Sequence, residues 1–210
     1  MEEKIKPVSE KTYHALSLDG GGSRGLFTLK VLAKIAELWH EFRKDVPFYK
    51  LFDVIGGVSV GGVIATAIAT GLFEQESIRN SLVMDGNVIF GLKNEDEPIF
   101  APTYTGFEKE AMIAKNFGNL KLKDVKIPLL IVCTTLNFFP VIFQSWNPEH
   151  ENLLLREILN ATCAAPSYFP PAKIGERYFW DGGMYSNNPT DLTILELKKL
   201  FMVNNVINVK

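Results

Sequence analysis

The feature that most constrains this chain is a serine flanked by glycines, Gly57-Val58-Ser59-Val60-Gly61, which has the form G-x-S-x-G. The apolar pair Val54-Ile55 leads into it, and the small apolar run 63–69 follows. This order is typical of a buried strand, a tight turn with a serine at its tip, and then a helix. Glycines beside such a turn let neighbouring backbone come close. The pattern therefore predicts a serine hydroxyl exposed at the end of a strand.

The rest of the chain alternates between strand-like and helix-like segments. Short apolar runs indicate strands, and apolar residues three and four positions apart indicate helices. The predicted strands are 11–18, 51–58, 128–136, 141–146, 177–180 and 206–209, and the predicted helices are 24–42, 60–72, 74–82, 107–117, 153–163 and 189–201. Such alternation predicts an α/β fold with a central, largely parallel sheet.

Residues 85–105 show neither the apolar run of a strand nor the apolar spacing of a helix. Glycine, asparagine and proline interrupt this segment, yet it also carries apolar residues such as Phe90, Phe100 and Tyr104. A loop of this length is either functional or packed locally. Two alternatives stay open: a lid or lipid-facing rim, or a loop that packs on the core.

Size and composition suit one globular domain over residues 1–210. The chain has 210 residues, of which 47% are hydrophobic and 22% charged, enough for a sizeable core. The predicted strand 206–209 lies at the very end, which leaves open a continuation past Lys210. A net charge of −2 gives no electrostatic footprint for nucleic acid.

Cellular location is inferred from the cysteines and the N-terminus. Cys133 and Cys163 lie in apolar surroundings without metal-ligand spacing, which is typical of buried thiols in a reducing compartment. The charged start of the chain lacks the apolar core of a secretory signal. We therefore expect a cytoplasmic protein.

An uncharged segment, 54–73, approaches the roughly 20 residues that span a bilayer. Gly56, Gly57, Gly61 and Gly62 crowd its first half, and each costs a helix up to about 1 kcal/mol relative to alanine. A strand, turn and helix explain these glycines, so we expect no transmembrane segment.

A glycine-rich loop, Asp19-Gly20-Gly21-Gly22-Ser23-Arg24-Gly25, joins the first predicted strand to its helix. Unshielded N–H groups beside a helix N-terminus are what an oxyanion hole requires. Gly20, Gly22 and Gly25 also spell the dinucleotide motif G-x-G-x-x-G, but the acidic residue that this motif needs at the end of the next strand is missing. A purely structural turn is the remaining alternative.

A base is needed to activate Ser59, because a serine hydroxyl is a weak nucleophile. The histidines are His14, His40 and His150, and none stands where a Ser–acid–His triad would place it. Asp181 follows a short aromatic strand and precedes Gly182 and Gly183. Partial burial there would raise the pKa of its carboxyl towards that of a useful base. An ordinary Asp-Gly turn is the alternative.

Together, the motifs DGGGSRG, GVSVG and DGG, in this order, resemble the patatin-like phospholipase family. The resemblance extends through residues 165–171 and 187–189 and covers most of the chain. It implies a three-layer α/β/α fold and a Ser–Asp dyad without histidine, with Ser59 as nucleophile and Asp181 as base. It also implies an oxyanion hole from the N–H groups of Gly20, Gly21 and Gly22. Further motif positions are Gly25, Gly57, Gly61, Gly182, Gly183 and Arg24. Two alternatives stay open for Arg24: contact with a phosphate or other anion, or an ion pair with a nearby acidic side chain.

The function implied by this resemblance is hydrolysis of a fatty acyl ester, as in a phospholipase A. The substrate is then a lipid at a membrane surface or micelle, reached by peripheral membrane association, without a metal or cofactor. The family usually continues into a strand and a Ser-x-Gly-Thr-Gly-like turn, which this chain lacks. Two alternatives remain: a catalytically silent module that binds lipid or protein, and a nucleotide-binding domain.

Overall fold

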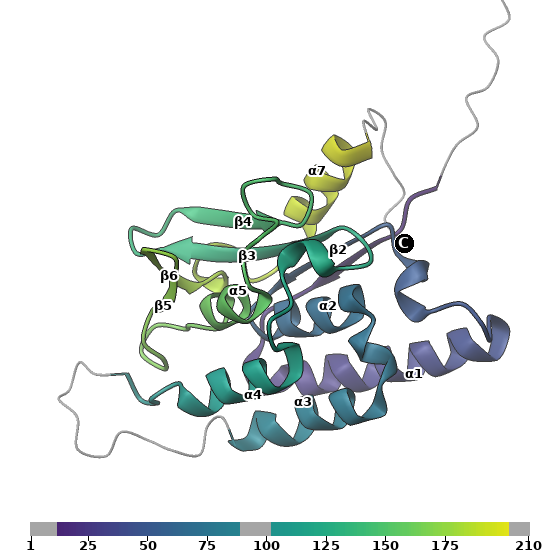
Figure 1. Ribbon diagram of the computed structural model, residues 1–210, viewed down its shortest axis with the longest axis horizontal. Coiled ribbons are helices and arrows are strands. Elements are labelled where there is room, and N and C mark those ends of the chain that lie inside the picture. The colour runs from purple at the N-terminus through teal and green to yellow at the C-terminus, as the bar shows by residue number, and fades with distance from the viewer. Residues whose placement is uncertain (1–11, 89–101, 202–210) are drawn as a thin grey trace, which may run out of the picture.

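The structure, a computed structural model, describes residues 12–88 and 102–201. A mixed sheet forms its centre (Figure 1). The strands in the described part are β1 (Ala15–Leu18), β2 (Val54–Val58), β3 (Leu129–Thr135), β4 (Pro140–Gln144), β5 (Ala172–Ile174) and β6 (Arg177–Asp181). Their order across the sheet is β1-β2-β3-β6-β5, and β4 pairs separately with β3.

Strand direction follows from the connections. β1, β2 and β3 pair in parallel, and helical crossovers of the kind that parallel pairing requires connect them. β4 and β6 both pair antiparallel with β3, and β5 pairs antiparallel with β6. β5 therefore runs in the same direction as β1, β2 and β3. The α/β class with mainly parallel strands, expected from the sequence, is confirmed.

Both edges of β3 are occupied, and one edge holds two strands. β4 covers one edge, with Val132 opposite Ile142. On the other edge, Val58 at the end of β2 pairs with Val132, and Asp181 at the end of β6 pairs with Cys133. β2 and β6 thus meet end to end along β3.

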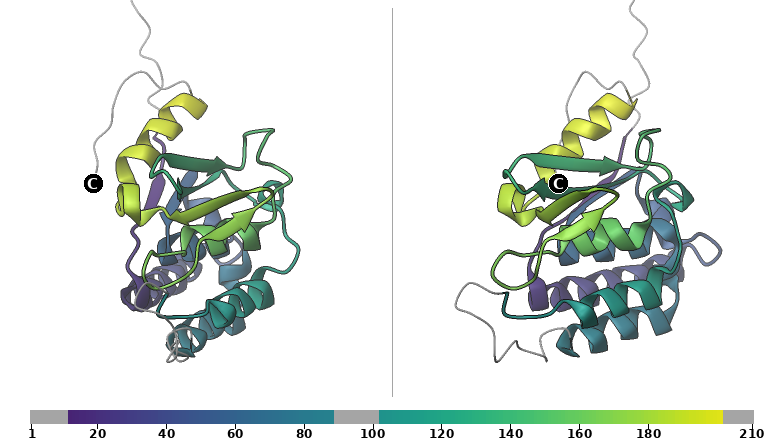
Figure 2. Two further views of the ribbon diagram at one scale, coloured as in Figure 1. Left: turned by 90° about the vertical axis from the view of Figure 1, so that its left-hand side faces the viewer. Right: turned by 60° about the vertical axis from the view of Figure 1, so that its left-hand side comes forward.

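Helices lie on both faces of the sheet, which gives the expected three layers (Figures 1 and 2). α7 covers one face, and α1 to α5 lie on the other. The helices of the described residues are α1 (Gly25–Phe42), α2 (Val60–Thr70), α3 (Glu76–Val88), α4 (Phe107–Phe117), α5 (Leu155–Thr162), α6 (Gly183–Ser186) and α7 (Thr190–Phe201).

The most buried elements are β2, β3 and α2. All five residues of β2 are buried, as are all but the first residue of α2. A strand covered on both faces reads as a continuous apolar run rather than an alternating one. The uncharged segment 54–73 is therefore a core strand followed by a core helix. Among the described residues, no helix combines the length and apolarity needed to cross a membrane.

Some elements differ from the sequence predictions at their ends. α4 has the predicted bounds, whereas α3 continues beyond residue 82 to Val88, into the segment that was expected to be a loop. β5 and α6 were not predicted, because three or four residues are too few to show a period. Residues 89–101 and the predicted strand 206–209 lie outside the described residues.

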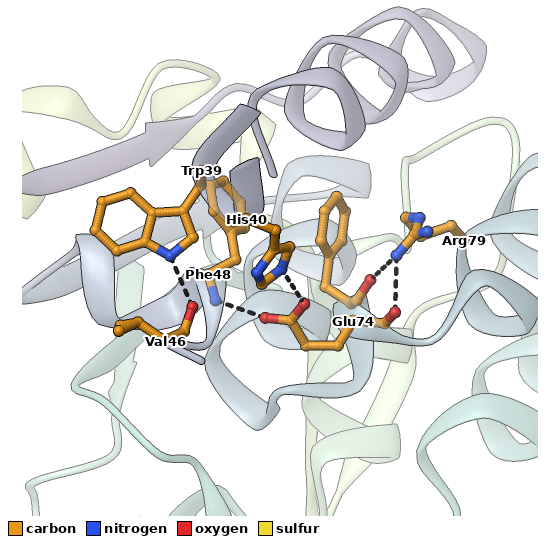
Figure 3. A network of polar contacts seen from close by, with 7 residues as sticks. Trp39, His40, Val46, Phe48, Glu74 and Arg79 are labelled. Atoms are coloured by element: carbon orange, nitrogen blue, oxygen red, sulfur yellow. Dashed lines mark hydrogen bonds and ion pairs between the residues drawn. The ribbon is translucent and has the colours of Figure 1, made fainter. Parts of the chain in front are cut away.

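A polar network ties the far end of α2 to α1 and α3 (Figure 3). The Glu74 carboxylate accepts the backbone N–H of Phe48 at 2.5 Å and lies 2.8 Å from Nε2 of His40. Arg79 donates to the carbonyl oxygens of Phe73 and Glu74, and Trp39 donates to that of Val46. The contacts of Phe73 and Glu74 hold the turn that follows the C-terminal end of α2. Ser59 lies at the N-terminal end of the same helix.

We predict that Glu74→Ala lowers the free energy of unfolding by about 1–3 kcal/mol, because it leaves the buried N–H of Phe48 without an acceptor. Urea denaturation measures this loss. The matched control is Glu176→Ala, which removes an exposed ion pair with Lys173 and should change stability much less. Equal effects of the two substitutions would contradict the role given to Glu74.

Candidate active site

Ser59 lies in the tight turn between β2 and α2, as its motif predicts. Its backbone has φ 54° and ψ −132°, a conformation that is strained for a residue with a side chain. A Cβ added at Gly61 would collide with the carbonyl oxygens of Leu18 and Asp19, and one at Gly57 would meet Gly61 O at 2.7 Å. The motif glycines therefore allow β1, β2 and α2 to approach closely enough to form this turn.

Asp181 lies next to Ser59. The Ser59 hydroxyl donates to Oδ2 of Asp181 at 2.7 Å, and the Gly183 N–H donates to Oδ1 at 2.7 Å. Both side chains are buried, with 9% of Ser59 and 6% of Asp181 exposed. Their proximity follows from the sheet, because β2 and β6 end at adjacent positions of β3.

The charge state of Asp181 is set by opposing influences. Burial raises the pKa of its carboxyl above the ordinary value. The Gly183 N–H, the Ser59 hydroxyl and the Lys109 ammonium act in the opposite direction, because each stabilises the ionised form. A raised carboxyl pKa makes Asp181 a better proton acceptor than an exposed aspartate.

The glycine-rich loop lies against Ser59. A Cβ on Gly20 would collide with Oδ1 of Asn187 and lie 3.1 Å from Cβ of Ser59. Asn187 binds the loop twice: its carbonyl accepts the Gly20 N–H at 3.0 Å, and its Nδ2 donates to the Gly20 carbonyl at 2.9 Å. Gly20 therefore needs to be glycine for close packing.

This pairing alters one expectation about the oxyanion hole. The N–H of Gly20 is already engaged by Asn187 and is not a free donor. Within the described residues, the N–H groups of Gly21 and Gly22 have no acceptor, and both glycines line the same cavity as Ser59. Gly22 has φ 53°, a conformation that favours glycine. Of the three consecutive glycines, Gly21 and Gly22 thus keep a free N–H donor.

A cavity of about 490 Å³ opens in front of Ser59 and Asp181. Its wall is mostly apolar and includes Leu29 of α1, Ile64 of α2 and Met112 of α4. Its polar groups are few and include the two site residues, the glycine loop and Lys109. Such a cavity suits a largely apolar ligand with one polar group held at Ser59.

The remaining motif residues take different places. Arg24 is exposed and lies outside this cavity, beside a second hollow on the outer side of the glycine loop. A Cβ on Gly25 would collide with Val60, and one on Gly182 would collide with the carbonyl of Val132. These two glycines serve close packing, whereas Gly183 also donates its N–H to Asp181.

All three histidines lie in the described residues, and none lines the cavity. The backbone of His14 pairs with Asp53, and the ring of His40 contacts Glu74 (Figure 3). The ring of His150 packs against Phe143 and accepts the backbone N–H of Gln144. Each histidine therefore has a structural position away from Ser59.

Two residues that sequence reasoning missed contribute to the site. Thr162 is fully buried; its hydroxyl accepts the Ser59 N–H at 2.9 Å and donates to the Val132 carbonyl at 2.6 Å. Lys109 lines the cavity although a lysine in a predicted helix suggests a surface position. Neither residue belongs to a motif, so only its contacts reveal it. Both cysteines are buried, as expected.

The arrangement suits attack of a serine on an ester carbonyl. It combines a hydroxyl bonded to a buried carboxylate, two free N–H groups and an apolar cavity. No cluster of three potential metal ligands occurs in the parts of the chain that the structure describes.

Comparison with known proteins finds similarity to patatin-like proteins and phospholipases. The family described as Patatin-like phospholipase matches residues 16–194. A cGAMP-activated phospholipase of Escherichia coli (strain TW11681) is 31% identical, over 92% of this chain and 58% of the relative. Patatin-like protein 1 of Oryza sativa subsp. indica is 29% identical, over 90% and 52%. Human calcium-independent phospholipase A2-gamma is 31% identical, over 94% and 27%. The chain thus spans about half the length of the first two relatives.

We predict that Thr162→Val lowers the free energy of unfolding by about 1–3 kcal/mol and slows reaction of Ser59 with a fluorophosphonate. Valine keeps the shape of threonine but leaves the Ser59 N–H without its acceptor and the Val132 carbonyl without its donor. Thr162→Ser retains the hydroxyl and is the matched control. Stability and labelling equal to those of the wild type in Thr162→Val would exclude this role.

Proposed function

The chain belongs to the patatin-like phospholipase family, and we propose that it is a lipid acyl hydrolase in which Ser59 is the nucleophile and Asp181 the general base. The observation that carries the proposal is the 2.7 Å hydrogen bond from the Ser59 hydroxyl to the buried Asp181 carboxylate. The absence of a histidine from the cavity lining, among the described residues, supports a dyad rather than a triad.

In the proposed mechanism, Ser59 Oγ attacks the ester carbonyl carbon while Asp181 Oδ2 accepts the hydroxyl proton. The tetrahedral intermediate collapses to an acyl-enzyme, and the proton on Asp181 passes to the leaving alcohol oxygen. Asp181 then accepts a proton from a water molecule as that water attacks the carbonyl carbon of the acyl-enzyme. The second tetrahedral intermediate collapses, Asp181 returns the proton to Ser59 Oγ, and the fatty acid is released.

The oxyanion in this mechanism is stabilised by the N–H groups of Gly21 and Gly22. Both line the cavity beside Ser59 and lack another acceptor within the described residues. Arg24 lies on the outer side of the same loop, where its guanidinium is exposed. We assign it to an anionic group of the substrate outside the cavity, such as a lipid phosphate.

A lipid substrate is supported by the apolar wall of the cavity and by its rim. Tyr168 and Met184 line the cavity and are about half exposed, so apolar surface continues from the interior to the mouth. Phe27, beside the glycine loop, is 75% exposed. An apolar rim of this kind suits contact with a micelle or membrane surface, from which an acyl chain can enter.

We predict that Ser59→Ala and Asp181→Asn each reduce hydrolysis of p-nitrophenyl and phospholipid esters by a factor on the order of 10³ or more. The two variants should fold normally. At neutral pH, Asp181→Asn should be at least as stable as the wild type, since it replaces a buried carboxyl of raised pKa by a neutral amide. Appreciable hydrolysis by either folded variant would disprove the dyad.

A fluorophosphonate probe separates the enzyme from a catalytically silent lipid- or protein-binding module. Labelling of the wild type but not of Ser59→Ala supports the hydrolase. A folded wild type that binds phospholipid vesicles but is never labelled supports the silent module instead.

The pH dependence provides a further prediction. Asp181 must be ionised to accept a proton, so kcat/KM should fall as the pH decreases through the pKa of Asp181. The part of the pH profile where kcat/KM falls towards low pH is called the acidic limb. Because burial raises the pKa of Asp181, the midpoint of the acidic limb should lie at a higher pH than the ordinary pKa of an aspartate. A profile measured on a neutral ester checks this expectation, and a limb at or below the ordinary aspartate range would contradict it.

A further inference from the structure

Lys109 is a buried cation that the proposed mechanism does not use. It lies on α4, is 3% exposed and lines the cavity beside Ser59 and Asp181. Its Nζ donates to the carbonyl oxygens of Asn160 at 3.1 Å and Cys163 at 3.3 Å. The ammonium also lies 4.6 Å from the centre of the Phe169 ring, a favourable cation–π distance.

The two carbonyls belong to the segment 160–164 at the end of α5, where helix carbonyl groups lack partners within the helix. This segment contacts both members of the proposed dyad. The Thr162 hydroxyl accepts the N–H of Ser59, and the Ala164 carbonyl accepts the N–H of Asp181 at 2.9 Å. Its position therefore influences the distance between Ser59 and Asp181.

We propose that Lys109 is a positioning residue for the dyad: its ammonium holds the end of α5 against Ser59 and Asp181 and provides the positive charge that favours ionised Asp181. This inference rests on the proposed function of Ser59 and Asp181.

Packing alone does not explain a lysine at this position. Burial of an ammonium is costly, and an apolar side chain of similar length often packs as well or better. Burial lowers the pKa of Lys109, and the negative charges of Glu110 and Asp181 act against that decrease. A charged group kept at such a cost beside a site is a candidate for a role in that site.

The groups that act on Asp181 come from several elements. Cys133 on β3 and Cys163 after α5 are thiols whose pKa burial raises, that of Cys163 to about 12, so both are neutral at physiological pH. Ser59 and Gly183 donate hydrogen bonds to the carboxylate, and Lys109 on α4 acts through its charge. Lys109 is thus a cation among the groups of the described residues that shift the pKa of Asp181 most.

The effect of removing this cation has a defined sign. Without Lys109, the ionised form of Asp181 loses stabilisation, so its pKa rises further. Activity requires ionised Asp181, and therefore the acidic limb of the pH profile should move to higher pH. A purely structural contribution would lower the rate at every pH without moving the limb.

The test measures the pH dependence of fluorophosphonate labelling and of kcat/KM for p-nitrophenyl butyrate in the full chain. We expect Lys109→Met to shift the acidic limb upward by roughly half a pH unit or more. Lys109→Arg keeps a cation and should leave the limb near that of the wild type. The matched control is Lys30→Met, which removes an exposed lysine of α1 and should change nothing.

If Lys109→Met does not fold, Lys109→Gln provides the same test, because it retains an N–H donor for the α5 carbonyls but carries no charge. An unshifted limb in a folded neutral variant overturns the inference, whether or not the rate falls. Absence of Ser59 labelling in the wild type would instead overturn the proposed function, so the two failures are distinguishable.

Discussion

The pairing along one edge of β3 is the constraint on which the rest of the site depends. Val132 pairs with Val58, the last residue of β2, and the adjacent Cys133 pairs with Asp181, the last residue of β6. Ser59 and Asp181 are 122 residues apart in the sequence and meet because two strands end at neighbouring points of a third. A shift of one residue in either register would also turn the strand's side chains to the opposite face.

Around this junction, the structure stabilises groups that are unfavourable by themselves. Ser59 has a strained backbone, Asp181 is a buried carboxyl and Lys109 is a buried ammonium. Each is held by hydrogen bonds from the segments that converge there. Thr162 accepts the Ser59 N–H, Gly183 binds the Asp181 carboxylate, and the end of α5 receives the Lys109 ammonium. Breaking any of these hydrogen bonds would leave a buried polar group unsatisfied. Because that is costly, a fully bonded cluster of this kind is rigid.

Much of the fold and part of the site were predictable from the sequence. The spacing of apolar residues predicted both ends of α1, α2, α4 and α7 to within two residues, because these helices present a long apolar face or lie in the core. Short elements such as β5 and α6 carry too little periodicity to be recognised. The contributions of Thr162 and Lys109 were also beyond the sequence, since each depends on contacts with distant backbone rather than on a local pattern.

The sequence by itself indicated the turn at Ser59, because the backbone of that turn leaves no room for a Cβ at Gly57. Gly61 belongs to the same motif but is required by a tertiary contact, the close approach of the backbone at Leu18 and Asp19. The sequence also indicated Asp181, through its resemblance to a family and the lack of a suitably placed histidine. Only the tertiary structure decided which loop donors are free, since the Asn187 carbonyl engages Gly20 and leaves Gly21 and Gly22. It alone placed a lysine inside the cavity, because burial depends on how α4 packs against α5 and not on the composition of α4 itself.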